Sequence, residues 1–178
     1  CNKRRDITLL HKIPDRMGSG LPGMMSVQFC GGVFMIQKVD FKYSNDITVI
    51  NREQFDAHIR LYEGYINNIN KIDSILEKSI DQKDKALREL ANSTFSIFRE
   101  LKRGETYALD GVILHELYFG NIGGNQEPDR LLLDIFKRDF GSYKNWQEDF
   151  IATAKASRGW AVLAFDQRSG RYRNISLD

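Results

Sequence analysis

The sequence predicts an α+β protein in which an N-terminal antiparallel helical hairpin precedes a C-terminal α/β domain with a small antiparallel sheet. Three observations point to this class. Long stretches between residues 51 and 119 place apolar residues at helical spacing. Two shorter helical patterns follow, and residues 160–177 alternate like two strands joined by a tight turn.

The composition is that of an ordinary globular protein. Of the 178 residues, 42% are hydrophobic, which is enough to bury a core. Lys and Arg (26) nearly balance Asp and Glu (24), and the net charge of +2 argues against a basic nucleic-acid arm or a polybasic membrane segment. No apolar run reaches the roughly 18 residues of a membrane span. We therefore expect no nucleic-acid or membrane partner and a cytoplasmic location.

Residues 1–35 differ from the rest of the chain. They contain all four methionines and show no sustained period of 2 or 3.6. We expect an irregular extension here, and we hypothesise that Met35 is the biological start and that the preceding residues are translated upstream sequence. The two cysteines, Cys1 and Cys30, also lie in this stretch. They indicate neither a disulfide framework nor a thiolate metal site.

Residues 36–124 are expected to form the helical-hairpin domain. Asn51 and Gln54 have the spacing of a capping box, which predicts a helix that ends near Lys78. Its apolar face carries Phe55, Ile59, Tyr62, Ile66, Ile69, Ile72 and Leu76. A polar link at 81–85 leads to a second pattern with Leu87, Leu90, Phe95, Phe98 and Leu101. Gly104 is expected to interrupt it before a helix resumes over 107–119. Because the link is short, the two helical stretches should run antiparallel.

Residues 125–178 are expected to form a partial α/β domain. Pro128 suits the first turn of a third helix, and Ser142 caps a fourth. A strand over 160–165, a turn over 166–170 and a strand over 171–177 then predict an antiparallel ribbon. A two-stranded ribbon alone is marginal in water. We therefore expect a sheet that is cut off at Asp178.

Two histidines on the predicted helices are the strongest candidates for chemistry. His58 shares a helical face with Tyr62 and Tyr65, whereas His115 shares its face with Tyr118 and Phe119. By residue type alone, core histidines and core aromatics are the commoner outcome. Two imidazoles that face each other across one hairpin favour a metal site, but they are too few ligands for a catalytic metal. The neighbouring carboxylates are predicted to be solvated: Asp56, Glu63, Asp110 and Glu116.

Four segments, at 65–70, 115–121, 139–142 and 159–163, resemble those of a known family both in their residues and in their order along the chain. With them, residues 41–178 resemble the iron/manganese superoxide dismutase family. The resemblance implies superoxide as substrate, one Fe or Mn ion per complete site, and a homodimer in complete members. It also implies an Asp-x-x-x-His segment that supplies two further metal ligands, and no such segment is present in this sequence.

Residue by residue, the resemblance makes His115 the metal ligand of the second helix. The first ligand of the family lies eight residues before the gateway tyrosine, and eight residues before Tyr65 lies Ala57. His58 is one residue out of that register, so either the site has lost this ligand or the helix lacks a one-residue π-bulge and His58 swings into place. We expect the second, because His58 is the only imidazole nearby. Tyr65 resembles the gateway tyrosine, with Tyr62 as its competitor. The pocket wall is expected to consist of Trp160, Tyr118 and Phe119.

The resemblance implies superoxide dismutation by a single redox-active Fe or Mn as the function of a complete site. For this chain, which lacks two expected ligands, we expect weak or no activity. Two other functions stay open from the residues: a non-catalytic scaffold of the same fold without metal, which would pair through its open strand edge, and a metal-binding protein without turnover.

Overall fold

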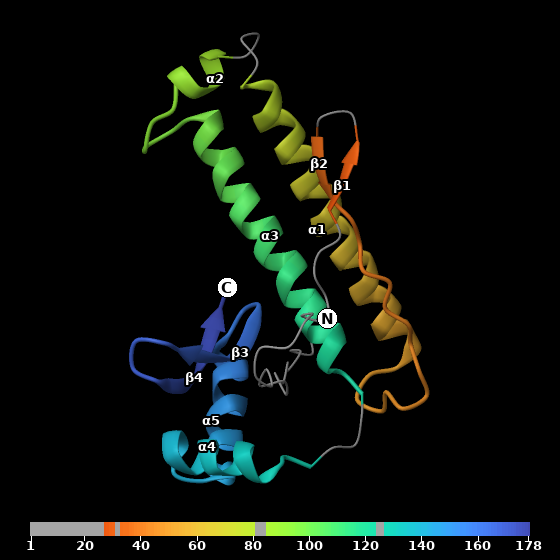
Figure 1. Ribbon diagram of the computed structural model, residues 1–178, viewed down its shortest axis with the longest axis vertical. Coiled ribbons are helices and arrows are strands. Elements are labelled where there is room, and N and C mark those ends of the chain that lie inside the picture. The colour runs from red at the N-terminus through yellow and green to blue at the C-terminus, as the bar shows by residue number, and fades with distance from the viewer. Residues whose placement is uncertain (1–26, 31–32, 81–84, 124–126) are drawn as a thin grey trace. The chain divides into compact units, whose positions relative to one another are not determined.

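The computed structural model describes residues 27–30, 33–80, 85–123 and 127–178. It is an α+β structure, mostly helical with a small two-stranded antiparallel sheet near the C-terminus, as predicted (Figure 1). The described residues fall into two compact units, one that ends at Phe119 and one that runs from Gly120 to Asp178. Within the described ranges, no helix has both the length and the apolar character needed to cross a bilayer.

The first unit contains a short antiparallel strand pair that the sequence pattern does not predict. β1 (Val27–Cys30) pairs with β2 (Val33–Ile36), although no regular structure is expected before residue 36. β2 lies against helix α1 (Arg52–Lys78), where the Asn70 side chain accepts from the Ile36 amide at 2.9 Å and donates to its carbonyl at 3.0 Å. This contact joins residues 34 positions apart, so no local period could reveal it.

Helix α1 begins where the sequence predicts. The Asn51 side chain accepts from the Gln54 amide at 2.8 Å, and the Gln54 side chain accepts from the Asn51 amide at 3.0 Å. These reciprocal bonds satisfy two of the amide groups that every helix N-terminus leaves without an intrahelical partner. The helix buries one apolar face along its length: Phe55, Tyr62, Ile66, Ile69 and Leu76.

The next helical stretch is divided differently from the prediction. α2 covers only Lys85–Glu89, and α3 covers Ile97–Asn121. Between them, the Asn92 side chain accepts from the amides of Thr94 and Phe95, a local turn that competes with helix. The expected interruption at Gly104 is wrong, because α3 continues through it. A Cβ at Gly104 would lie 3.2 Å from the end of the Ile72 side chain on α1.

Helices α1 and α3 lie side by side and run in opposite directions (Figure 1). Near the start of α1, the Phe55 ring contacts Phe119 at the end of α3, with centroids 5.2 Å apart. Near the end of α1, Ile72 meets Gly104 in the first half of α3. Phe41, in the segment before α1, stacks on Phe119 with centroids 4.9 Å apart. This arrangement brings His58 and His115 to the same level of the helix pair.

The second unit packs two helices against the sheet. α4 (Arg130–Phe140) is capped by Asp129, and α5 (Tyr143–Ala156) by Ser142. Pro128 therefore precedes the cap of α4 and does not lie in its first turn. β3 (Trp160–Asp166) pairs antiparallel with β4 (Arg171–Leu177), as predicted. The core of this unit consists of Leu132, Phe136, Trp146, Phe150, Ala154, Ala161 and Leu163.

A buried carboxylate ties α4 to β4. The Asp139 side chain is only 1% exposed and accepts two hydrogen bonds of 2.7 Å from the Arg138 guanidinium. It also accepts from the backbone amide of Tyr172 on β4 at 2.8 Å. These bonds stabilise the charged form, and the Arg138 hydrogen bond above all lowers the pKa of Asp139 below its usual range. The sheet is thus anchored to the helix layer by a charge-assisted contact as well as by the apolar core.

Candidate metal centre

Both histidines of the helix pair are held by the turn that precedes them. His58 Nδ1 lies 2.8 Å from the Gln54 carbonyl, and His115 Nδ1 lies 2.7 Å from the Gly111 carbonyl. Helical side chains lean toward the N-terminus, which brings the ring over the carbonyl four residues earlier. Because a carbonyl only accepts, each Nδ1 must carry the proton. A neutral imidazole in this tautomer binds a metal through Nε2, and a backbone carbonyl on Nδ1 is the usual support of such a ligand.

The separation of the two rings tests whether they could share one ion. With a metal–nitrogen distance of roughly 2.1 Å, two imidazoles at ordinary coordination angles have centroids about 4.6–5.3 Å apart. The centroids of His58 and His115 are 6.3 Å apart, and their planes are inclined by 48°. The rings are therefore of the right type and tautomer, but their centroids would have to approach by roughly 1–1.7 Å for both rings to bind the same ion at such angles.

Aromatic side chains surround the pair. The His115 ring lies 5.4 Å from Tyr65 and 6.3 Å from Tyr62, centroid to centroid. The His58 ring stacks on Tyr118 at 5.2 Å, while Phe119 lies 6.3 Å from His115. His115, Tyr118 and Phe119 are buried, with 3%, 2% and 6% of their surfaces exposed. All of the candidate residues on α1 and α3 therefore gather in one cluster, which we call the histidine cluster.

Glu116 takes part in this cluster, although the sequence predicts a solvated residue. Its carboxylate accepts a 2.6 Å hydrogen bond from the Tyr62 hydroxyl, whose oxygen also accepts from the Val39 amide at 2.9 Å. Burial, and then the bond to Glu116, raise the pKa of Tyr62 far above its ordinary value. The partners are 54 residues apart, and only the close approach of α1 and α3 could have revealed them.

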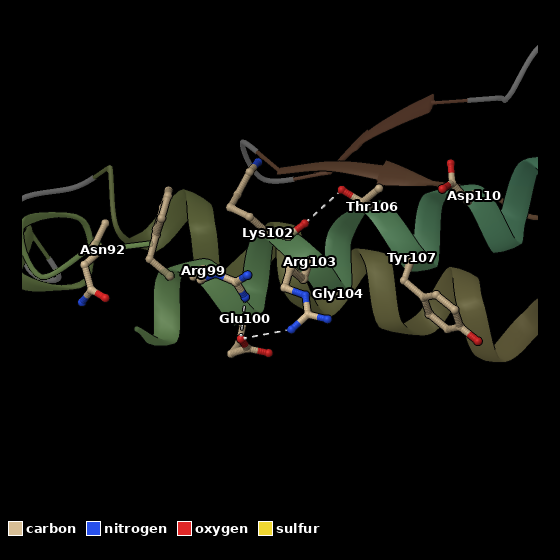
Figure 2. Close-up of a pocket in the computed structure, with 11 residues that line it drawn as sticks. Asn92, Arg99, Glu100, Lys102, Arg103, Gly104, Thr106, Tyr107 and Asp110 are labelled. Carbon is tan, nitrogen blue, oxygen red and sulfur yellow. Dashed lines mark hydrogen bonds and ion pairs between the residues drawn. The ribbon is translucent and has the colours of Figure 1, made fainter. Parts of the chain in front are cut away.

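Tyr65 connects the cluster to the surface through Tyr107. The Tyr65 hydroxyl donates to the Tyr107 hydroxyl at 3.4 Å, and the two rings meet edge to face with centroids 5.7 Å apart. Burial and this hydrogen bond raise the pKa of Tyr65 to about 12. Figure 2 shows Tyr107 among the residues of an open pocket along the first half of α3, where Glu100 pairs with Arg99 and Arg103.

The described residues offer part of a metal-ligand set. In the described ranges of both units, no three His, Cys, Asp or Glu side chains gather as a metal site requires. The two imidazoles thus fit two positions of an Fe or Mn ligand set, and the described residues do not supply the others. Trp160 begins β3 in the second unit, so its place in a pocket wall with the histidines stays a prediction.

Comparison with known proteins gives this arrangement its context. No protein-family profile matches the chain. It is 40% identical over 150 residues to the superoxide dismutase (Fe) of Aquifex aeolicus, covering 83% of this chain and 68% of that protein. It is also 38% identical over 150 residues to the superoxide dismutase (Fe) of Aquifex pyrophilus, again covering 83% of this chain and 68% of that protein.

A third relative carries the other metal in its name. The superoxide dismutase (Mn) 1 of Halobacterium salinarum is 34% identical over 125 residues, which is 69% of this chain and 56% of that protein. Identity of this degree over most of the chain cannot arise from shared composition alone. The chain belongs to the iron/manganese superoxide dismutase family.

Proposed function

We propose that the histidine cluster is part of a site for superoxide dismutation, with His115 and His58 as two of the ligands of one Fe or Mn ion. The observation that carries the proposal is the buried His115 ring, whose Nδ1 proton is directed at the Gly111 carbonyl at 2.7 Å. This contact sets the tautomer that binds metal through Nε2. The family relationship to proteins named for iron and for manganese supports the identity of the ion.

The two tyrosines supply hydroxyl groups beside the ligands. In dismutation, two superoxide ions and two protons give one dioxygen and one hydrogen peroxide, and the bound metal supplies the one-electron oxidation and reduction. Tyr65 and Tyr62 both have raised pKa values, so each keeps its proton at neutral pH. A phenol has one proton to donate, and Tyr62 gives it to Glu116 at 2.6 Å. Tyr65 makes only the longer 3.4 Å contact with Tyr107, so it is the better placed of the two to donate to an anionic reactant instead. We propose Tyr65 as the residue at the entrance and Tyr62, which Glu116 holds in place, as its neighbour.

The ligand set of this chain supports weak metal retention. Two imidazoles without a carboxylate leave Fe or Mn under-coordinated. The 6.3 Å ring separation also requires the helix pair to adjust before both rings reach the ion. We therefore propose that residues 1–178 on their own bind metal substoichiometrically and have weak or no dismutase activity. Its helix pair would be the helical-hairpin domain of the family over residues 36–124, and 125–178 would be part of the α/β domain with Trp160 in the pocket wall.

Metal loading of matched histidine variants tests this proposal. The purified chain is incubated with Fe(II) or Mn(II) and desalted, and then the metal per chain and the rate of superoxide dismutation are measured. We expect substoichiometric metal that is lost in His115→Ala and reduced in His58→Ala. The third histidine, His11, lies outside the described residues, and His11→Ala serves as the matched control.

Three results would contradict parts of the proposal. One tightly bound ion per chain with dismutase activity would overturn the claim of weak retention. Metal retention that is equal in all three alanine variants would overturn the ligand assignment. A folded chain that binds neither metal at any loading concentration would favour the non-catalytic scaffold, because the family fold would then be present without its metal chemistry.

A further inference from the structure

Gly111 is placed where a side chain could not be accommodated. A Cβ built on Gly111 would lie 2.5, 2.6 and 2.7 Å from three ring atoms of Tyr65. These distances are far below ordinary carbon–carbon contact, which has its optimum at roughly 3.5–4.0 Å. The Tyr65 ring therefore lies directly on the α3 backbone at this position. The same residue presents its carbonyl to His115 Nδ1.

A glycine inside a helix lowers the stability of that helix, so its presence at position 111 needs a local explanation. Gly111 is buried in the interior of α3, where alanine would favour the helix more. The helical glycine Gly64 on α1 is different, since a Cβ there would have nothing within 4 Å. The contrast identifies close approach of the Tyr65 ring as the reason at Gly111.

The contacts of Tyr65 show what this close approach achieves. With its ring on the backbone of Gly111, Tyr65 contacts two other rings. Its ring centroid lies 5.4 Å from that of His115 and 5.7 Å from that of Tyr107. A methyl group at position 111 would push the ring off the helix and away from both neighbours.

We propose that Gly111 is a positioning residue of the histidine cluster, which admits the Tyr65 ring beside His115 through its missing side chain and fixes the His115 tautomer through its carbonyl. The placement rests on the geometry of the helix pair alone, and its importance for chemistry rests on the proposed function. Its test therefore uses the metal-free chain. A failure of metal binding or of dismutation would leave the test intact.

The experiment compares Gly111→Ala with Gly64→Ala as the matched control. Thermal unfolding and the NMR signals of the His115 ring protons are measured for each, because an aromatic ring shifts the resonances of protons near its face. We expect Gly64→Ala to keep or raise the melting temperature and to leave the His115 signals in place. Gly111→Ala should lower the melting temperature and move the His115 signals.

A second pair of variants keeps the test decisive if Gly111→Ala does not fold. In a Tyr65→Ala background the clash is gone, so Gly111→Ala should become neutral or stabilising there, as expected of alanine in a helix. A reversal of sign between the two backgrounds supports the proposal. The proposal is overturned if Gly111→Ala behaves like Gly64→Ala in the native background, or if it destabilises the Tyr65→Ala chain equally.

Discussion

Replacing Tyr62 by phenylalanine should measure how strongly the histidine cluster is held together. The change deletes one hydroxyl from a side chain that is 1% exposed. That hydroxyl donates to Glu116 at 2.6 Å and accepts from the Val39 amide at 2.9 Å. A hydrogen bond to a charged group contributes about 1.5–3 kcal/mol, and a neutral one about 1 kcal/mol. Glu116 is half-buried and water can partly replace its lost partner. We therefore expect Tyr62→Phe to lower the free energy of unfolding by about 2–3 kcal/mol.

Urea denaturation near neutral pH, followed by circular dichroism, provides the assay. Glu116→Gln keeps an oxygen that can accept from Tyr62, so it should cost about 1 kcal/mol. In the double variant the two losses should not add, because Tyr62→Phe removes the bond that Glu116→Gln only weakens. Tyr143→Phe is the matched control, since the Tyr143 ring packs on Phe136 and Trp146 and its hydroxyl makes no hydrogen bond within the described ranges. The reasoning is refuted if Tyr62→Phe costs no more than this control, or if the losses at Tyr62 and Glu116 add in full.

Three further predictions concern the anchors of the fold and the titration of the cluster. Asp139→Asn removes the charge that pairs with Arg138 and, at 3.9 Å, with Arg171 on β4, and urea denaturation should show a loss of about 1.5–3 kcal/mol. Unchanged stability would contradict the anchoring role. In an alkaline titration followed by ultraviolet difference spectra, Tyr65 should ionise near pH 12, and Tyr107→Phe should lower that midpoint because the Tyr107 hydrogen bond helps to raise it. Since the pKa of Tyr65 in the folded chain lies above the ordinary value of 10.0, its contribution to stability is complete below pH 10 and should be lost as the pH rises toward 12. A titration midpoint that Tyr107→Phe leaves unchanged would count against the contact between the two hydroxyl groups. Asn70→Ala removes both hydrogen bonds to the Ile36 backbone, so hydrogen exchange at the Ile36 amide should accelerate while the helical circular dichroism persists. Unaltered exchange would show that the Asn70 side chain does not hold β2 on α1.

The parts of the fold that the sequence predicts are those with short-range signals. The capping box of Asn51 and Gln54 spans three residues and is present as expected. The cap at Ser142 and the turn between β3 and β4 are equally local. In each case the residues that choose the backbone conformation also satisfy its hydrogen bonds, so the neighbouring sequence contains enough information.

The wrong predictions arise where a local signal competes with a general pattern. Apolar residues at Leu90 and Phe95 suggested a continuous helix, but Asn92 forms a turn there, and these two side chains are 72% and 85% exposed. Gly104 suggested an interruption, but packing against Ile72 keeps α3 continuous. Periodicity cannot show which of two competing local preferences will be overruled by tertiary contacts.

In the histidine cluster, too, the sequence indicates the short-range features and misses the contacts between distant residues. Helical spacing places His58 with its tyrosines on α1 and His115 with Tyr118 and Phe119 on α3, and the structure brings both groups together. The contacts of the cluster that the sequence does not indicate are those of Glu116, Tyr107 and Gly111. Each acts on a residue of α1 that is more than forty positions away, as the 42 positions from Tyr65 to Tyr107 and the 54 from Tyr62 to Glu116 show.

By itself, the sequence determined the class of the fold, the starts of α1 and α5, the C-terminal strand pair and the two histidines on which the proposed chemistry depends. These features follow from periodicity and capping, which act over one or two helical turns. Only the tertiary structure decided that Glu116 accepts from Tyr62, that Asn70 bonds to the Ile36 backbone of β2, and that the Tyr65 ring lies against the backbone of Gly111. Such contacts depend on the distance between α1 and α3 or between α1 and β2, and that distance is set by the packing of many side chains at once.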